Sequence, residues 1–473
     1  MVSFIAYDLI FLAVFTLFVV VFLYTRRENL QRQGILYLYR TRFGLKVIEW
    51  TAKKFEKILR PMQYIIIACG YILMISIIWL LGKFMYAYFV FDIAEQIKVP
   101  PLLPLFPYAT DLFQVDFLPP FYFTYWIIVI AIIAISHEFA HGIFARLNNI
   151  KVKSTGFGFL GPFLAAFVEP DEKQMQKAKK FPQLSILAAG TFANVVMTIL
   201  FALIMWLFFI WSFAPAGVIF NAYGTSVISI DGIDSVNGVQ IENLEHLKSI
   251  VNTGNQSELS EITYEEDSYL VPLGNINRTL NLGLSEMSVY DDAPAVKDGL
   301  KIGNPITEID GKDVTNFEEL GNEIKSKAPG EEIIITIIEE DVEVERKITL
   351  GEKDGNAYLG IGIAMPSQEG FSGKFTGLIY SIKNPFIYYE PSWDGDFAWF
   401  IYDLLWWIVL INISVALVNM LPVGIFDGGR FFYLTIWGIT GSEKIGKQAF
   451  AFTTWLILFL ALLLMVRWAF AFF

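Results

Sequence analysis

Six long apolar runs constrain this chain more than any other feature of its sequence. They lie near residues 3–24, 63–91, 121–147, 183–213, 398–421 and 449–473. Each run is long enough to cross a bilayer as a helix, which takes about 20 residues. The composition agrees, because 55% of the 473 residues are hydrophobic and 17% are charged, against roughly 25% charged in an average soluble domain. The sequence therefore predicts an α-helical polytopic membrane protein with about six transmembrane helices.

The acidic residues are concentrated between the fourth and fifth runs. Residues 214–374 contain 29 Asp and Glu but only 11 Lys and Arg, a net charge of −18, whereas the whole chain carries −12. An acidic region is thus inserted into a membrane protein that is otherwise slightly basic. A negative net charge disfavours binding to a phosphate backbone, so we expect no nucleic-acid partner.

Basic residues in two loops predict the orientation of the helices. Residues 25–60 contain ten Lys and Arg against three acids, and residues 148–182 contain six Lys against three acids. The positive-inside rule places both loops in the cytoplasm. The loop 92–120, both termini and the insert 214–397 then lie outside. We expect a multi-pass protein of the plasma membrane.

The insert is predicted to be rich in β-structure. In its second half, a strand at 306–309 ends at Asp310-Gly311, which is a turn signal. A helical pattern follows at 317–324, and alternating residues at 332–339 and 344–350 indicate two further strands. This order of elements resembles a PDZ domain.

A shift of 79 residues suggests a second copy of this pattern. Ala293-Pro294-Ala295 then corresponds to Ala214-Pro215-Ala216, and Ile309-Asp310-Gly311 to Ile230-Asp231-Gly232. Such self-similarity indicates an internal duplication. The fold class is completed by an inserted β-rich, tandem PDZ-like region outside the membrane. Any other small β-rich domain is the alternative.

The third apolar run carries the pattern His-Glu-x-x-His. Residues four apart share one helix face, so His137 and His141 can reach one metal ion. Glu138 lies beside them and can take a proton from water activated by the metal. A charged residue in a membrane helix costs roughly 2.5–3.5 kcal/mol and is usually functional. The alternative is a buried polar cluster between helices.

A catalytic zinc takes three protein ligands and keeps one position open. Residues 142–149 contain no histidine, and His246 lies in the insert, so a carboxylate from another helix is expected. The candidates are Asp403, in the fifth run, and Asp427, at its cytoplasmic end. Asp427 follows a segment with Asn, Pro and Gly, and broken backbone at membrane depth is tolerated where it lines a cavity. Otherwise, Asp427 is a turn residue facing the cytosol.

At these residues the chain resembles the site-2 protease family of intramembrane zinc metalloproteases. That family has His-Glu-x-x-His on one span, and Asn-x-x-Pro followed by Asp-Gly on a later one. The resemblance implies that His137, His141 and Asp427 bind one Zn²⁺ per chain and that Glu138 is the general base.

Four further residues match the family patterns. Gly190 and Asn194 fit a Gly-x-x-x-Asn on the following span, although small residues at this spacing also serve ordinary helix packing. Asn419 and Pro422 belong to the Asn-x-x-Pro signature. The resemblance implies that all four line the active site.

The resemblance also implies a reaction, which is hydrolysis of a peptide bond in the membrane helix of a substrate. The active site would lie nearer the cytoplasmic face. Gly156–Pro170 looks like a membrane re-entrant β-loop whose edge strand could pair with an unwound substrate, or else like a surface loop. The partners would be the lipid bilayer and transmembrane protein substrates, already trimmed by another protease and admitted by the PDZ-like domains.

The predicted organisation has five parts. They are two N-terminal spans with their loops (1–120), the catalytic helices and re-entrant loop (121–213), a first PDZ-like domain (214–290), a second one (291–370), and an interfacial connector with the C-terminal helices (371–473).

Three other functions are compatible with parts of the sequence. A protease that trims prenylated tails is disfavoured by the Asn419–Asp427 segment. A non-catalytic scaffold that binds peptides through PDZ-like domains is disfavoured by Glu138, which such a protein does not need. A metal transporter is disfavoured because few ionisable residues lie in the spans.

Overall fold

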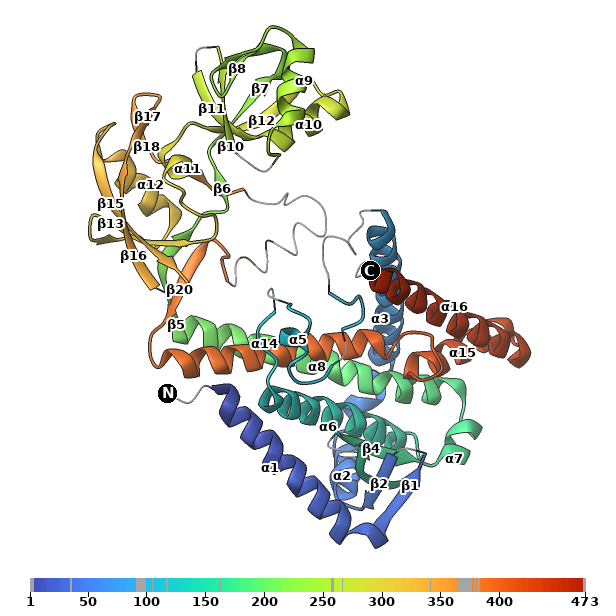
Figure 1. The fold of residues 1–473 in the computed structure, drawn as a ribbon. Helices are drawn as coiled ribbons and strands as arrows, with labels where there is room; N and C mark the ends of the chain where they lie inside the picture. The colour runs from blue at the N-terminus through green and yellow to red at the C-terminus, as the bar shows by residue number, and fades with distance from the viewer. Residues whose placement is uncertain are drawn as a thin grey trace. The chain divides into compact units, whose positions relative to one another are not determined.

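The chain forms two compact units in the computed structural model, residues 1–209 with 399–473 and residues 210–398. The first unit is helical and the second contains most of the β-structure (Figure 1). The structure describes residues 4–34, 36–90, 99–103, 105–115, 118–160, 163–256, 259–265, 267–340, 342–364, 377, 380 and 383–470. Part of the connector expected at 371–397 therefore lies outside the described residues.

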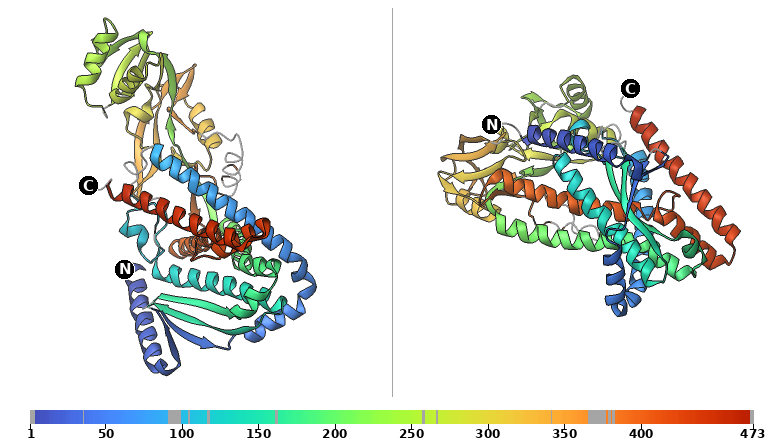
Figure 2. Two further views of the ribbon diagram at one scale, coloured as in Figure 1. Left: turned by 90° about the vertical axis from the view of Figure 1, so that its right-hand side faces the viewer. Right: turned by 90° about the horizontal axis from the view of Figure 1, so that it is seen from below.

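Six helices in the described part of the chain are long and apolar enough to span a membrane. They are α1 (Phe4–Thr25), α3 (Glu56–Val90), α6 (Phe123–Leu147), α8 (Lys180–Ser212), α14 (Gly395–Val418) and α16 (Glu443–Phe470). Each overlaps one of the six predicted runs, so the prediction of a multi-pass membrane protein is confirmed. The hairpin of α15 (Asp427–Thr440) with α16 follows α14 (Figure 2).

Helix α6 is packed along its whole length, and two buried clusters hold it. Its N-terminal half, including Phe123 and Val129, packs with Trp407 of α14. Its C-terminal half, including Phe144, packs with residues of α2 (Leu45–Lys54), α3, α8 and α15. Burial on both sides fixes the helix that carries the His-Glu-x-x-His pattern.

A four-stranded antiparallel sheet packs against α6. Its order is β1 (Leu30–Gln33), β2 (Leu36–Thr41), β3 (Val152–Leu160) and β4 (Phe163–Pro170). The segment Gly156–Pro170, predicted as a re-entrant loop, contributes most of the β3–β4 hairpin. The β1–β2 hairpin was not predicted, because its short strands lie in a segment whose main signal was positive charge. Strand β4 is the edge strand and contacts α6.

The second unit contains two antiparallel six-stranded sheets. The first domain, residues 225–291, consists of β7 (Thr225–Ser229), β8 (Ile233–Val236), β9 (Val239–Gln240), α9 (Leu244–Thr253), β10 (Leu259–Tyr264), β11 (Asp267–Pro272), α10 (Leu273–Leu282) and β12 (Glu286–Asp291), with strand order 7-12-11-10-8-9. Its buried core includes Val236, Ile262 and Ile276.

The second domain is built from separated parts of the chain. Its main sheet has the order β16 (Val342–Thr349), β15 (Glu332–Glu339), β13 (Pro305–Ile309), β5 (Phe213–Ile219) and β20 (Ile387–Pro391), with β14 (Lys312–Asp313) beside β13. It also contains α11 (Pro294–Lys297), α12 (Phe317–Lys325) and the short strands β6 (Ala222–Tyr223), β17 (Gly351–Lys353), β18 (Asn356–Tyr358) and β19 (Ile361–Gly362).

The two domains are nested rather than consecutive. Strand β5 pairs with β13 and β20, so the first strand of the second domain precedes the whole first domain. Residues 214–219, predicted to belong to the first domain, are therefore corrected to the second. Strand β20, predicted to lie in a connector, is corrected likewise.

The first domain has a turn like that at Asp310-Gly311, but it lies at Asn237-Gly238 and not at Asp231-Gly232, where the 79-residue shift had placed it. In the first domain, Asn237-Gly238 has φ angles of 49° and 77°, and in the second domain Asp310-Gly311 has 51° and 75°. Two consecutive positive φ angles define a tight hairpin turn that accepts Asn or Asp before Gly. Asp231-Gly232 instead forms a 3₁₀ turn, and Ala214–Ala216 lies in a strand whereas Ala293–Ala295 begins a helix.

Candidate metal centre

The two histidines of the pattern meet on one face of α6. Their ring centroids are 4.7 Å apart, and the Nε2 atoms of His137 and His141 are separated by 3.0 Å. Both side chains are largely buried. The helical spacing of four residues thus brings two nitrogen ligands together, as predicted from the sequence.

The first span of the chain fixes the start of α6. Asp8 of α1 accepts hydrogen bonds from the backbone N–H groups of Phe123 and Thr124 at 2.7 and 2.9 Å, and from the Tyr108 hydroxyl at 2.5 Å. Tyr122, at the N-cap, makes no side-chain capping bond. A carboxylate from another helix therefore caps α6, and nothing in the sequence pattern indicated this role.

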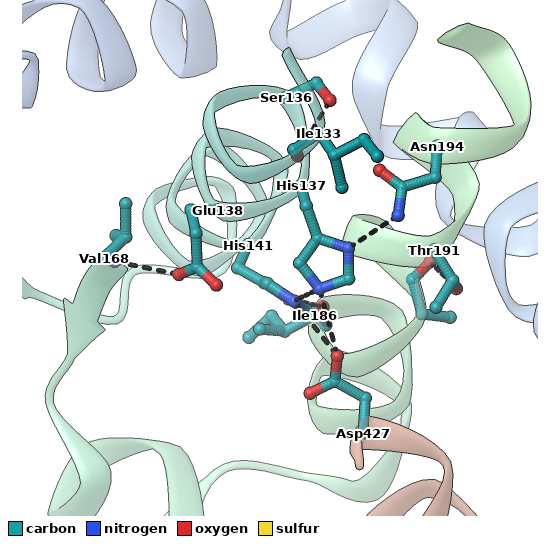
Figure 3. A network of polar contacts seen from close by, with 11 residues as sticks. Ile133, Ser136, His137, Glu138, His141, Val168, Ile186, Thr191, Asn194 and Asp427 are labelled. Carbon is teal, nitrogen blue, oxygen red and sulfur yellow. Dashed lines mark hydrogen bonds and ion pairs between the residues drawn. The ribbon is translucent and has the colours of Figure 1, made fainter. Parts of the chain in front are cut away.

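Asp427 reaches the histidines because α14 ends at Val418. An irregular segment follows, and Asp427 is the first residue of α15. The backbone N–H of Gly428 donates to the Asn419 carbonyl at 2.8 Å, and a Cβ atom at Gly428 would lie 2.4 Å from the Met420 carbonyl oxygen. Glycine at 428 therefore permits the tight turn that aims Asp427 at the site (Figure 3).

The three side chains have the geometry of a zinc site. Oδ2 of Asp427 lies 3.3 Å from Nε2 of both His137 and His141. These three atoms are thus 3.0–3.3 Å apart. Ligands at roughly 2.0–2.1 Å around a tetrahedral zinc are separated by about 3.3 Å. The donor set and its spacing therefore fit zinc, with one position left for water or substrate.

Each histidine is oriented through its other ring nitrogen. Nδ1 of His141 donates to the Ile186 carbonyl at 2.7 Å, and Nδ1 of His137 lies 3.1 Å from the Asn194 amide nitrogen. Oδ1 of Asn194 is buried without a partner in the described structure. Turning this amide over places its oxygen against Nδ1–H of His137, which is the tautomer that binds metal through Nε2. Asn194 is therefore placed to orient the His137 ring.

Gly190 lies directly against the ligand atoms. A Cβ atom at this position would lie 2.4 Å from Nε2 of His141 and 2.5 Å from Nε2 of His137. Such distances are shorter than real Cβ contacts, so a larger residue would collide with the two Nε2 atoms that face Asp427. The match to the family pattern at Gly190 thus has a steric reason.

Glu138 lies between the histidines and β4 on the same cavity. Its Oε2 accepts a hydrogen bond from the backbone N–H of Val168 at 2.9 Å (Figure 3). Because this N–H points to Glu138 and not to β3, the open edge of β4 faces the site. The glutamate and an unpaired strand edge are therefore neighbours.

A cavity of about 540 Å³ joins these groups. Its lining includes His137, Glu138, His141, Val168, Asn419, Asp427, Glu172 and Arg430. Of the predicted lining residues, Asn419 lies on this cavity. Pro422 is buried in the irregular segment, where its carbonyl accepts a hydrogen bond from Thr453 at 3.3 Å.

Sequence reasoning missed the charged pair in this cavity. Arg430 of α15 lies 3.2 Å from Glu172, the first residue of α7 (Glu172–Lys177), and also donates to Gln183. The sequence offered one indication of Arg430: it lies three residues after Asp427, and residues three apart share a helix face.

Comparison with known proteins shows which family and which relatives the chain resembles. The model of Peptidase family M50 matches residues 125–465. The zinc metalloprotease RasP of Shouchella clausii is 26% identical over 34% of this chain and 45% of that protein. An uncharacterised protein of Methanocaldococcus jannaschii is 32% identical over 37% of this chain and 46% of that protein. The chain spans about half the length of these curated relatives.

A solved structure is similar to a small part of the chain. It is the PDZ domain of an SdrC-like protein from Listeria monocytogenes, 33% identical, with a TM-score of 0.15. It covers 15% of this chain and 78% of that chain.

Proposed function

The chain belongs to peptidase family M50, the site-2 protease family, and from this premise we propose that it is a zinc-dependent intramembrane endopeptidase. The family makes it a membrane metalloprotease with a metal cofactor. The proposal adds that its substrates are transmembrane segments of other proteins. One observation carries it: three ligand atoms 3.0–3.3 Å apart share a cavity with a glutamate and an open strand edge.

The ligands would be His137, His141 and Asp427, and bound zinc supplies a Lewis acid that activates water and polarises a peptide carbonyl. Glu138 accepts a proton from the attacking water while the water oxygen bonds to the carbonyl carbon. The same carboxyl then gives that proton to the amide nitrogen as the C–N bond breaks. Asn194 keeps His137 in the tautomer that this chemistry requires.

Strand β4 would present the substrate to these groups. A peptide bond in a helix is shielded by its own hydrogen bonds, so the substrate must unwind before it is cut. An unwound segment can add to the open edge of β4, where the Val168 N–H lies beside Glu138. This pairing would bring a substrate carbonyl into the cavity in extended form.

The β-rich unit would restrict access to substrates already trimmed by another protease. Its second domain has a groove of about 160 Å³ between α12 and residues 357–361, lined among others by Leu320, Gly321 and Ile361. We interpret both domains as PDZ-like, which is consistent with a strand, a tight turn and a helix in the same order in each. A groove between a helix and a strand suits an extended peptide.

The loops support a topology in which this unit is extracytoplasmic. The basic segments 25–60 and 148–182 would face the cytoplasm, and the metal centre would lie nearer that side. The plasma membrane remains the proposed location.

The decisive experiment compares the wild type with Glu138→Gln in detergent. We expect about one zinc per chain in both, and cleavage of a single-span substrate only by the wild type. Glu172→Gln is the matched control, because it removes another carboxylate of the same cavity and should retain cleavage. Chelation should abolish wild-type cleavage, and added zinc should restore it.

Two results would contradict the proposal. Absence of zinc from the wild type, under conditions that do not strip metal, would favour the scaffold instead. Cleavage by Glu138→Gln at the wild-type rate would show that Glu138 is not the general base.

Gating has a separate test, since Gly321 lies on the groove and a Cβ atom there meets nothing within 4 Å. Gly321→Leu should fill the groove and change the ratio of cleavage rates for full-length and trimmed substrates. An unchanged ratio would exclude this groove from gating while leaving the catalytic proposal intact.

A further inference from the structure

Helix α2 presents an apolar and aromatic face that the described part of the chain leaves uncovered. Trp50 and Val47 are each 54% exposed, and Phe43, just before the helix, is 82% exposed. The opposite face carries Ile48 and Ala52, which are buried. A ten-residue helix rarely exposes an apolar strip on the side opposite its buried face unless another protein or a lipid bilayer covers that strip.

Lysines surround this strip. Lys46, Lys53 and Lys54 are exposed on α2, and Lys57 is exposed in the first turn of α3. The Lys54 ammonium lies 4.5 Å from the centre of the Trp50 ring. Lysine beside tryptophan is the combination found at membrane–water interfaces, where the ring lies at headgroup level and the ammonium reaches phosphate.

The acidic residues nearby do not neutralise these lysines. Glu49 lies 3.1 Å from Arg146, and Glu56 lies 2.7 Å from Arg60. Within the described part of the chain, none of the four lysines forms an ion pair with either glutamate. The surface around Trp50 is therefore positively charged as well as apolar.

The position of α2 in the chain brings this surface to the bilayer. It ends at Lys54, and the membrane-spanning helix α3 begins at Glu56. Basic clusters directly beside a membrane span attract anionic lipids. We propose that α2 lies on the membrane surface and binds anionic phospholipid headgroups through Lys53, Lys54 and Lys57, with Trp50 and Val47 inserted at the acyl-chain boundary.

The buried face of α2 connects this lipid contact to the catalytic helix. A Cβ atom at Gly142 would lie 2.9 Å from Cδ1 of Ile48, and one at Gly44 would lie 2.7 Å from the Phe139 ring. Gly142 and Phe139 flank His141 on α6. Helix α2 thus has one face toward the proposed lipid and the opposite face packed directly on α6, which carries His137 and His141.

Two measurements on the full chain test the proposal. In bilayers of phosphatidylcholine with phosphatidylglycerol, a spin label on Val47→Cys, in a Cys69→Ala background, should be reached by oxygen and shielded from a water-soluble relaxation agent. Added phosphatidylglycerol, compared with phosphatidylcholine, should raise the Tm of the solubilised protein, because a ligand that binds only the folded state stabilises it.

The charge requirement is tested with two triple variants of equal net charge. Lys53→Gln, Lys54→Gln and Lys57→Gln together should abolish most of the Tm shift caused by phosphatidylglycerol. Lys151→Gln, Lys173→Gln and Lys177→Gln together, in the other basic segment, should keep it. Equal shifts in both variants, or a label at position 47 that is open to water, would overturn the proposal and favour a soluble protein partner. Neither readout depends on proteolysis.

Discussion

Gly190 and His141 are packed so closely that a single methyl group cannot be placed between them. A Cβ atom on Gly190 would lie 2.4 Å from Nε2 of His141, the atom that faces Asp427. The space in front of the ligands is therefore open only because residue 190 has no side chain. Residue 190 of helix α8 thus leaves room in front of the two histidines because it is glycine.

Gly190→Ala should therefore lose most of its bound metal. The added methyl group displaces the histidine rings from the positions that give ligand spacings near 3.3 Å. Zinc per chain, measured on the purified protein, is the direct readout. Gly82→Ala is the control, because Gly82 also lies in a span and its Cβ would meet nothing within 4 Å. Equal zinc content in the two variants would contradict the steric argument.

Asn194→Ala should weaken metal binding without abolishing it. The variant removes the group beside Nδ1 of His137, and loss of such an orienting partner typically costs about 10–100-fold in metal affinity. Competition with a chelator measures this affinity. Thr198→Ala, one turn along α8, removes a hydroxyl that donates to the Asn194 carbonyl and, among the described residues, to no other group, so it should leave the affinity unchanged. An Asn194→Ala affinity equal to wild type would mean that Asn194 does not orient His137.

The pairing of the two histidines in the candidate metal centre was accessible to sequence reasoning because it is local to one helix. A spacing of four residues on a helix fixes the relation of His137 to His141. For the third residue, the sequence left Asp403 and Asp427 as candidates, and the resemblance to the site-2 proteases favoured Asp427. The positioning groups were not accessible in the same way. Backbone atoms such as the Ile186 carbonyl and the Val168 N–H carry no sequence signal, although they orient His141 and Glu138.

The nested arrangement of the β-rich domains was hidden for a different reason. Strand β5 precedes its partner β13 by the length of a whole domain, and strand pairing at such separation leaves no local pattern. The repeated Asp-Gly also did not predict the turn at Asn237-Gly238, which has the same backbone geometry as Asp310-Gly311. The two turns share no Asp-Gly sequence, but both place an Asn or Asp before Gly at two consecutive positions of positive φ.

Asp8→Ala should destabilise the helical unit. It leaves the N–H groups of Phe123 and Thr124 without their acceptor at the start of α6, at a cost of about 2–4 kcal/mol in the free energy of unfolding. Unfolding in sodium dodecyl sulfate measures this cost. Asp111→Ala changes an exposed acid in the segment that precedes α6 and should have little effect.

The same variant should keep its zinc while folded. The C-terminal half of α6, which carries His137 and His141, packs in a separate cluster from the N-terminal half. Wild-type stability in Asp8→Ala would show that another group caps α6. Loss of zinc from the folded variant would mean that the two halves of the helix are not held independently.

Asp291→Asn should loosen the junction between the nested domains. Asp291, in the first domain, accepts hydrogen bonds from Ser226 at 2.7 Å, and from Lys353 and Tyr358 of the second domain at 2.6 and 2.8 Å. We expect a cost of about 1–2 kcal/mol, reduced by the partial exposure of Lys353. Faster amide hydrogen exchange in β7 and β17 of the full chain would report it.

The pH dependence of this junction has a definite sign. Burial alone raises the pKa of Asp291, but the hydrogen bonds from Lys353, Ser226 and Tyr358 outweigh it, so the pKa lies below the ordinary carboxyl value of 3.8. Its stabilisation is then present above that value and is lost as the pH falls through the lowered pKa. Wild-type exchange in β7 should rise over this acidic range, whereas Asp291→Asn should show no such step. An identical acid profile in both proteins would remove Asp291 as the group responsible.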